Sequence, residues 1–288
     1  MKRVATPDGQ YVVVDNVTMH YHVLGDDPDL PVIIFTHGGG PGSTAWSNFH
    51  QSAPSFAKHF RCVYVDLPQF GRSEAVPIAG PVFTWHAKKL KGCMDALGIS
   101  HAHFVNQSFG GCVATRFAAD FPEYVNRLVM IGSQPVSKGV LTPLPLFSKH
   151  VTHLMADYYV NNGGPTQDKM RALIQKYELY DDEAVDEETV SLRYEASIQS
   201  GVADLMKTPS AFGEWEDLTS IFSRVTAPTL ICWGLHDWFG GIDVPMLMVN
   251  QFADARLHVV PNAAHHLQSE KPIEFYEIVD AFLRSAAR

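Results

Sequence analysis

A serine at the end of an apolar run is the first residue of this chain whose setting suggests chemistry. Residues 104–111, FVNQSFGG, predict a buried strand, a sharp turn with Ser108 at its apex, and the start of a helix. A serine hydroxyl becomes a strong nucleophile only when a base takes its proton, and such an elbow lifts the hydroxyl toward a base. Gly110 lets the helix start close to the strand. Asn106 stands where the GxSxG pattern has glycine, so a serine in an ordinary loop is the alternative interpretation.

Candidates for the base and its partner follow two later apolar runs. Asp237 comes after residues 229–234, TLICWG, and His265 comes after residues 256–260, RLHVV. An acidic residue after a strand is often only a helix cap, and the neighbouring His266 could replace His265 as the base. The stretch AHHLQSEKP fits the pattern GHxxxxExP only with His265 in the catalytic position, which favours the order Ser108, Asp237, His265.

A glycine-rich loop supplies a further chemical element. Residues 31–36, PVIIFT, predict a buried parallel strand, and residues 37–42, HGGGPG, follow it directly. Four glycines in six residues let the backbone approach a ligand and point N–H groups at it, as an oxyanion hole requires. A flexible loop is the bland alternative, and a phosphate cradle is disfavoured because the loop lacks both GK[ST] and GxGxxG.

The elements that must position these residues alternate along the chain. Residues 11–24 predict a hairpin that turns at Asp15-Asn16 and forms an antiparallel edge. Further strands are expected at 31–36, 61–65, 104–107, 127–132, 229–234 and 256–260, with helical patterns at 47–59, 83–97, 109–121 and 271–284. This alternation predicts a mostly parallel twisted sheet with helices on both faces.

The alternation stops between residues 137 and 209, where helical patterns rich in Met, Leu and Tyr contain no convincing strand. We therefore expect an α/β-hydrolase core formed by residues 1–136 and 210–288, with residues 137–209 as a helical lid over the carboxyl edge of the sheet. The lid carries an apolar set that could either contact substrate or attach the lid to the core: Leu141, Leu144, Leu146, Phe147, Leu154 and Met155.

Composition limits the possible partners. The 288 residues are 46% hydrophobic and 18% charged, and the 22 basic and 31 acidic residues give a formal charge of −9. Such a balance argues against nucleic acid or an anionic membrane as partner. We expect a cytoplasmic protein, because the sequence shows neither a signal-peptide pattern nor a stretch of transmembrane length. The four cysteines lack CxxC spacing and should be reduced core thiols. No metal is expected, since His150 and His153 lack a third ligand.

Several motifs together resemble one family. HGGGPG at 37–42 is followed by WSN at 46–48, and the elbow, LRYEA at 192–196, WGLHD at 233–237 and the His265 motif come later. From about residue 20 to the C-terminus the chain resembles the meta-cleavage product hydrolases, which cleave a carbon-carbon bond in ring-opened catechol-type aromatics. The HGGGPG loop with WSN is the most specific part of the match.

The resemblance implies a role for each matching residue. Ser108 would be the nucleophile, His265 the base and Asp237 the group that orients the imidazole. The backbone N–H groups of Gly39 and Phe109 would form the oxyanion hole. The substrate would be an anionic dienoate, a 2-hydroxy-6-oxohexa-2,4-dienoate. Arg193 and Asn48 would bind its carboxylate and its 2-oxo or 2-hydroxy end, and Gly38, Gln107 and His266 would also bind substrate. The family also implies a homo-oligomer and no cofactor.

Three departures from the family pattern concern substrate identity. The chain has Asn106 and Gln107 where the family has glycine and asparagine, and His266 where it has tryptophan. For the reaction itself three alternatives stay open: an ester or lactone hydrolase, a cofactor-free dioxygenase, and a non-catalytic binding protein of the same fold. The intact Ser108, Asp237 and His265 argue against the last.

Overall fold

A computed structural model describes residues 5–25, 27–136, 146–199 and 201–285. Its strands are β1 (Gly9–Val14), β2 (Val17–Leu24), β3 (Val32–Thr36), β4 (Arg61–Val65), β5 (Ile78–Pro81), β6 (Ala102–Gln107), β7 (Val125–Ile131), β8 (Phe212–Glu214), β9 (Thr229–Gly234) and β10 (Ala255–Val260). The α-helices are α1 (Ala45–Phe49), α2 (Ala53–Phe56), α3 (Val82–Ala96), α4 (Phe109–Asp120), α5 (Leu146–Tyr159), α6 (Gln167–Tyr177), α7 (Glu187–Gln199), α8 (Val202–Leu205), α9 (Asp243–Gln251), α10 (Leu267–Glu270) and α11 (Pro272–Arg284).

Eight strands form one sheet in the order β1-β2-β4-β3-β6-β7-β9-β10. All pairs from β4 to β10 are parallel, whereas β1 and β2 pair antiparallel at the edge. The predicted hairpin is confirmed, and its turn residues Asp15 and Asn16 have φ values of 45° and 62°. Asn and Asp tolerate this left-handed region better than other non-glycine residues.

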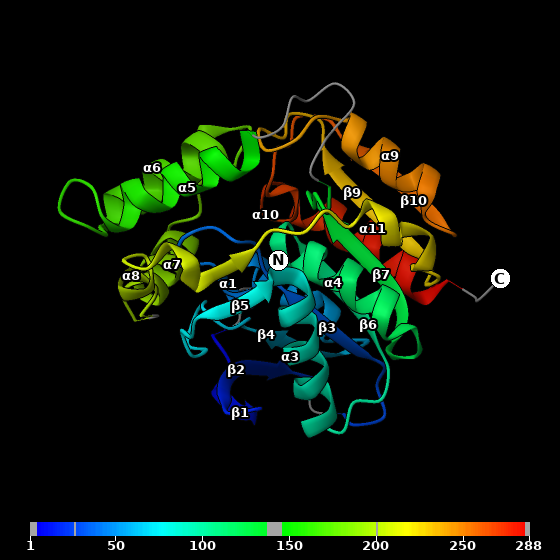
Figure 1. The fold of residues 1–288 in the computed structure, drawn as a ribbon. Helices are drawn as coiled ribbons and strands as arrows, with labels where there is room; N and C mark the ends of the chain where they lie inside the picture. The colour runs from blue at the N-terminus through cyan, green and yellow to red at the C-terminus, as the bar shows by residue number, and fades with distance from the viewer. Residues whose placement is uncertain (1–4, 26, 137–145, 200, 286–288) are drawn as a thin grey trace.

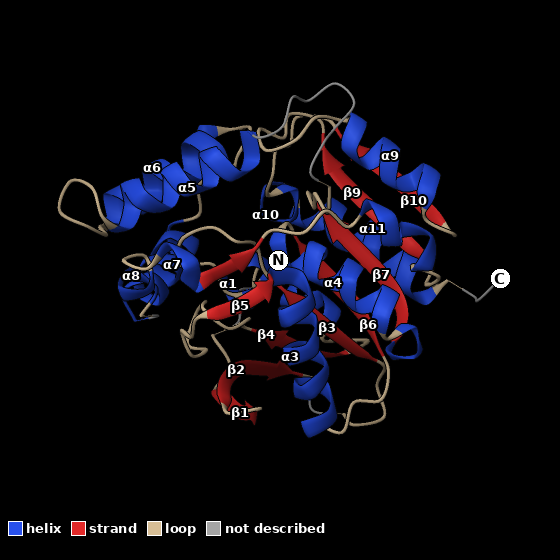
Figure 2. Ribbon diagram, viewed as in Figure 1, coloured by secondary structure: helices blue, strands red, loops and turns tan. Residues whose placement is uncertain are grey.

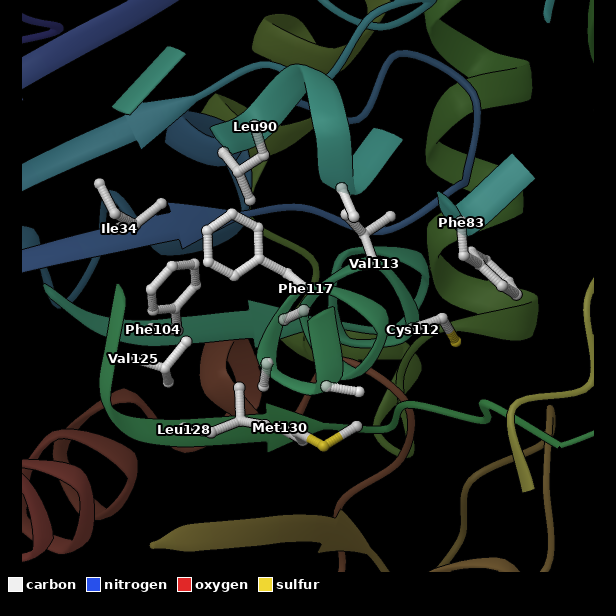
Figure 3. Close-up of a cluster of buried hydrophobic side chains, with 14 of the residues drawn as sticks. Ile34, Phe83, Leu90, Phe104, Cys112, Val113, Phe117, Val125, Leu128 and Met130 are labelled. Carbon is white, nitrogen blue, oxygen red and sulfur yellow. The ribbon is translucent and has the colours of Figure 1, made fainter. Parts of the chain in front are cut away.

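The inner parallel strands β3, β4, β6, β7 and β9 are almost entirely buried, as continuous apolar runs predict, whereas the edge strand β10 is mostly half-buried. Alternate residues of β6 enter two separate cores: Phe104 packs under α3 and α4, while Val105 packs on the side of α1, α2 and α11. Figure 3 shows the first core, in which Phe104, Phe117 and Leu128 lie between the sheet and α4. All four cysteines are free and buried, in agreement with core thiols.

One predicted helical stretch is divided. Residues 47–59 fold as two short helices, α1 and α2, with Pro54 in the first turn of α2. Proline has no N–H to continue an earlier helix but fits the first turn of a new one.

Helices α5 to α8 lie together beside the carboxyl ends of the strands, apart from the helices that cover the sheet (Figure 1). They share a small apolar core of their own, which includes Tyr158, Met170 and Val190. Figure 2 shows that the described part of 146–208 is helical or loop. The short strand β8 pairs with β5 as a separate two-stranded sheet, which the sequence did not indicate. Within the described ranges, no helix is both long and apolar enough to cross a membrane.

Candidate active site

The elbow at Ser108 is strained in the way a nucleophile turn requires. Ser108 has φ 50° and ψ −113° between β6 and α4, a conformation that costs a non-glycine residue on the order of 1–3 kcal/mol. Three backbone hydrogen bonds hold it: Ser108 N donates to Ile131 O at 2.8 Å, and Ser108 O accepts from Gly111 N at 3.0 Å and from Cys112 N at 3.2 Å. A Cβ at Gly110 would come within 2.8 Å of the His37 carbonyl oxygen, so glycine is needed there.

Asn106 takes the place of the motif glycine without affecting the elbow. Its buried amide accepts a hydrogen bond from Thr36 Oγ1 at 2.7 Å and donates to the Val129 carbonyl at 3.3 Å. Asn106 is absent from the residues with positive φ, so this position does not require glycine. The side chain therefore joins β6 to its neighbours β3 and β7.

The expected acid-base pair is assembled at the edge where β9 and β10 end. His265 Nδ1 lies 2.8 Å from Asp237 Oδ2, and both side chains are buried. The other oxygen of Asp237 accepts from Phe239 N at 2.8 Å, and the Phe239 ring lies on the His265 ring at a centroid distance of 4.3 Å. With Nδ1 bonded to the carboxylate, Nε2 is the atom that can exchange a proton with Ser108.

His37 fixes the glycine-rich loop from within the core. Its Nδ1 lies 2.8 Å from the Gly38 carbonyl oxygen, and its Nε2 accepts from Leu67 N at 3.0 Å. Burial lowers the pKa of His37, so the ring is neutral and can donate at one nitrogen while accepting at the other. A Cβ on Gly39 would meet Phe109 Cβ at 3.3 Å, which places the two expected oxyanion-hole residues side by side.

Gly38, Asn48 and Gln107 are also brought together. Asn48 Nδ2 lies 3.2 Å from Gln107 Oε1, and Gln107 Nε2 donates to the His265 carbonyl at 3.3 Å. A Cβ on Gly38 would lie 3.2 Å from Gln107 Cδ, so the glycine makes room for the longer amide. Gln107 thereby links the elbow to the histidine loop.

Arg193 is fully buried, and its guanidinium is already engaged. Nε and Nη2 donate to the Pro41 carbonyl at 3.1 and 2.9 Å, and Nη1 forms an ion pair with Glu178 Oε2. Arg193 thus joins α7 to the glycine-rich loop. Its expected contact with a substrate carboxylate stays a prediction.

Glu178 was not identified from the sequence. It follows α6, and its Oε2 also lies 3.5 Å from His266 Nε2. Burial alone would raise the pKa of Glu178, but Arg193 and His266 outweigh it and lower the pKa to about 2. Burial lowers the pKa of His266 to about 4, although Glu178 opposes this shift. At neutral pH the carboxylate is charged and His266 is neutral.

A cavity of about 580 Å³, lined by residues of the glycine-rich loop, the Ser108 elbow and α5, contains these groups. Ser108, Phe109 and His265 line it together with two sets of side chains. The polar set is Gln69, Gln107, Glu178 and His266, and the apolar set is Phe70, Val82, Leu154, Met155, Val160, Leu173, Val202, Met206, Phe212, Trp215 and Phe239. Arg193 and Asn48 are not among the described residues that line it.

Leu154 and Met155 of the predicted lid set thus reach the cavity, whereas Leu141, Leu144 and the side chains of Leu146 and Phe147 lie outside the described residues. The volume suits a small organic ligand.

Two other features do not belong to this chemistry. An open hollow of about 740 Å³ lies beside α6 and the Asp237 loop, but neither Ser108 nor His265 lines it. Among the described residues, His50, Asp186 and Glu188 hold possible metal-ligand atoms within 4.8 Å of one another, yet none lines the cavity. Asp186 Oδ2 accepts from Thr189 N at 3.0 Å, which identifies it as a cap of α7. The expectation of no metal stays a prediction.

Comparison with known proteins places this geometry in a family. The model of the alpha/beta hydrolase fold family matches residues 31–272. A 2-hydroxy-6-oxononadienedioate/2-hydroxy-6-oxononatrienedioate hydrolase of Burkholderia vietnamiensis is 31% identical, covering 95% of this chain and 94% of the relative. A 2-hydroxy-6-oxo-6-phenylhexa-2,4-dienoate hydrolase of Comamonas testosteroni is also 31% identical, covering 92% of this chain and 91% of the relative.

A solved structure of a meta-cleavage product hydrolase is also similar to this chain. The meta-cleavage product hydrolase of Pseudomonas fluorescens IP01 has a TM-score of 0.77 and 26% identity, covering 95% of this chain and 97% of that one. The predicted fold and resemblance are therefore confirmed: this chain belongs to the α/β-hydrolase fold family and, within it, to the meta-cleavage product hydrolases, enzymes of the serine-hydrolase type that cleave carbon-carbon bonds.

Proposed function

We propose that the substrate is a 2-hydroxy-6-oxohexa-2,4-dienoate, which the chain hydrolyses to a 2-hydroxypentadienoate and a carboxylic acid. The observation that carries the proposal is the presence of Ser108 and His265 on one cavity wall, with His265 Nδ1 held by Asp237 at 2.8 Å. The two relatives described above are named for substrates of this type.

The reaction would begin with ketonisation, in which the 2-hydroxyl proton moves to C5 of the dienol. Ser108 Oγ then attacks C6 and transfers its proton to His265 Nε2, while the 6-oxo oxygen becomes an oxyanion next to the N–H groups of Gly39 and Phe109. The C5–C6 bond breaks, its electron pair passes to the 2-oxo group as an enolate, and His265 returns the proton to the leaving dienoate. Water then attacks the acyl-Ser108 ester with His265 as base.

The apolar wall supports a hydrophobic substituent at C6. Leu154 and Met155 of α5 line the cavity, and so does Trp215, whose ring lies 6.3 Å from that of Phe109. Burial of an aryl or alkyl group here would add about 25 cal/mol to the free energy of binding for each Å² of apolar surface removed from water. We propose that the carboxylate end lies at the polar wall, near Gln107, His266 and the buried Asn48 and Arg193 behind it.

A second candidate, an ester or lactone hydrolase, gains support from the ion pair of Arg193 with Glu178, because the pair leaves the polar wall without net positive charge. The discriminating experiment mixes the protein with a yellow ring-cleavage dienolate and with p-nitrophenyl esters, with and without oxygen. Bleaching of the dienolate in both atmospheres is expected. Ester turnover without bleaching would favour the second candidate, and an oxygen requirement would indicate the cofactor-free dioxygenase.

The remaining proposals rest on the sequence pattern, for the division and the location, and on family resemblance, for the assembly and the absence of a cofactor. We propose a division into a core of residues 1–136 and 210–288 and a lid of residues 137–209, assembly as a homo-oligomer, catalysis without a cofactor, and a cytoplasmic location. Light scattering of the purified protein would measure the oligomeric state directly, and a mass equal to one chain would contradict the proposed homo-oligomer.

A further inference from the structure

An acidic side chain on the cavity wall neutralises the arginine expected to bind the substrate carboxylate. Glu178 lines the cavity, whereas Arg193 lies behind it. The two side chains meet beside Gly40, where an added Cβ would lie 2.8 Å from Arg193 Nη2 and 3.2 Å from Glu178 Oε1. The absence of a side chain at Gly40 therefore makes room for this ion pair.

The charges at the polar end of the cavity sum to about zero when Arg193, which lies behind the wall, is counted. Arg193 is positive, Glu178 is ionised and His266 is neutral at pH 7. His265 also faces Glu178, and its own partner is Asp237. A substrate carboxylate that approached Arg193 would meet the Glu178 carboxylate as well, and like charges in a buried site repel each other strongly.

We propose that Glu178 is a specificity-determining residue that cancels the charge of Arg193, so that this cavity discriminates little between a carboxylate and an uncharged polar group at the polar end of its substrate. The inference rests on the proposed function in that it concerns the same cavity and the same substrate end. It extends the accepted substrates to neutral derivatives such as amides and esters of the 2-oxo acid.

The test uses two small probes that differ only in charge, 2-oxopentanoate and 2-oxopentanamide, with binding measured by calorimetry in the Ser108→Ala protein. The Ser108→Ala protein, the parent in this test, should bind the two probes with dissociation constants within about tenfold of each other. In Glu178→Gln the ratio should shift toward the acid by on the order of 10- to 100-fold, the size expected from removing one charge about 6 Å away at an effective dielectric of about 20. Glu195→Gln, an exposed acid on α7, is the matched control and should leave the ratio unchanged.

A purely structural ion pair predicts a different result. If Glu178→Gln keeps the parent ratio, or if the parent already prefers the acid by more than 100-fold, the proposal is wrong. Should Glu178→Gln fail to fold, the double variant Arg193→Gln/Glu178→Gln removes both charges and must retain the parent ratio, so that a selective loss of acid binding overturns the proposal. Dienolate bleaching tests the reaction separately, because the probes report only on charge.

Discussion

Gly42→Ala should push α7 away from the glycine-rich loop. Gly42 has φ +64°, and an added Cβ would collide with the carbonyl oxygen of Arg193, lie 2.7 Å from its carbonyl carbon and 3.1 Å from Ser197 Cβ. These atoms belong to α7, and two of them are backbone, so the helix itself would have to move. The same helix holds the loop through the hydrogen bonds of Arg193 to Pro41.

A matched variant separates the two causes of destabilisation in Gly42→Ala, the left-handed backbone and the collision with α7. Gly98 has φ +68° with no described atom within 4 Å of an added Cβ, so Gly98→Ala isolates the cost of the left-handed backbone. That cost is about 1 kcal/mol, and the collision at Gly42 should add about 1–3 kcal/mol. For a chain of 288 residues, 1 kcal/mol corresponds to roughly 1.5–2 °C in Tm, because the entropy of unfolding is about 2.1 cal/mol/K per residue.

Thermal unfolding and ester turnover at 25 °C provide the assay. We expect Gly98→Ala to lose about 2 °C with kcat/KM unchanged. Gly42→Ala should lose roughly 2–5 °C more together with most of its turnover, because Gly39 lies on the same loop. Equal Tm shifts and equal kcat/KM in the two variants would refute the argument that close contact between loop and lid is required.

Three further predictions address the site and the core. Ser108→Ala should lower kcat on the order of 10⁴-fold or more while ligand binding remains, and a variant that kept most of its turnover would show that the nucleophile is misassigned. Arg193→Gln should lower kcat/KM for the dienolate more than for a small neutral ester, whereas an equal loss for both would mean that Arg193 only holds the lid. Burial lowers the pKa of His86 from 6.5 to about 3. Between these two pH values His86 is protonated in the unfolded chain and neutral in the folded chain, so the free energy of unfolding must fall as pH falls from 6.5 toward 3. The Tm of His86→Leu should therefore decline less between pH 7 and 4.5 than that of the parent, and parallel declines would contradict this.

The triad pair could be predicted because topology alone brings its loops together. β9 and β10 are parallel neighbours, so the residues that follow them share one sheet edge, and Asp237 and His265 meet there. The elbow was predictable for a different reason, since a buried strand before Ser108 and Gly110 after it define the turn from local sequence.

Glu178 shows what local sequence does not contain. It ends a helix with a strongly polar composition, where an acid normally faces solvent. Glu178 is buried because α6 and α7 place it against Gly40 and His266. Neither of these two contacts of Glu178 follows from a periodic pattern in the sequence. The short pair β5 and β8 escaped prediction because three or four residues containing Gly80 and Pro81 carry too little strand signal.

The three departures from the family pattern fall into two physical classes. Asn106 directs its amide into the sheet, where Thr36 and Val129 satisfy it, so this change concerns strand packing and not the substrate. Gln107 and His266 both line the cavity. His266 contacts Glu178, which in turn neutralises Arg193. A longer amide, a titratable ring and a buried acid thus replace or surround the same end of the cavity, while the triad geometry is left as the family resemblance implies. We therefore propose that the chain differs from its relatives in how it recognises the polar end of its substrate, and that it shares with them the residues for attack on the other end.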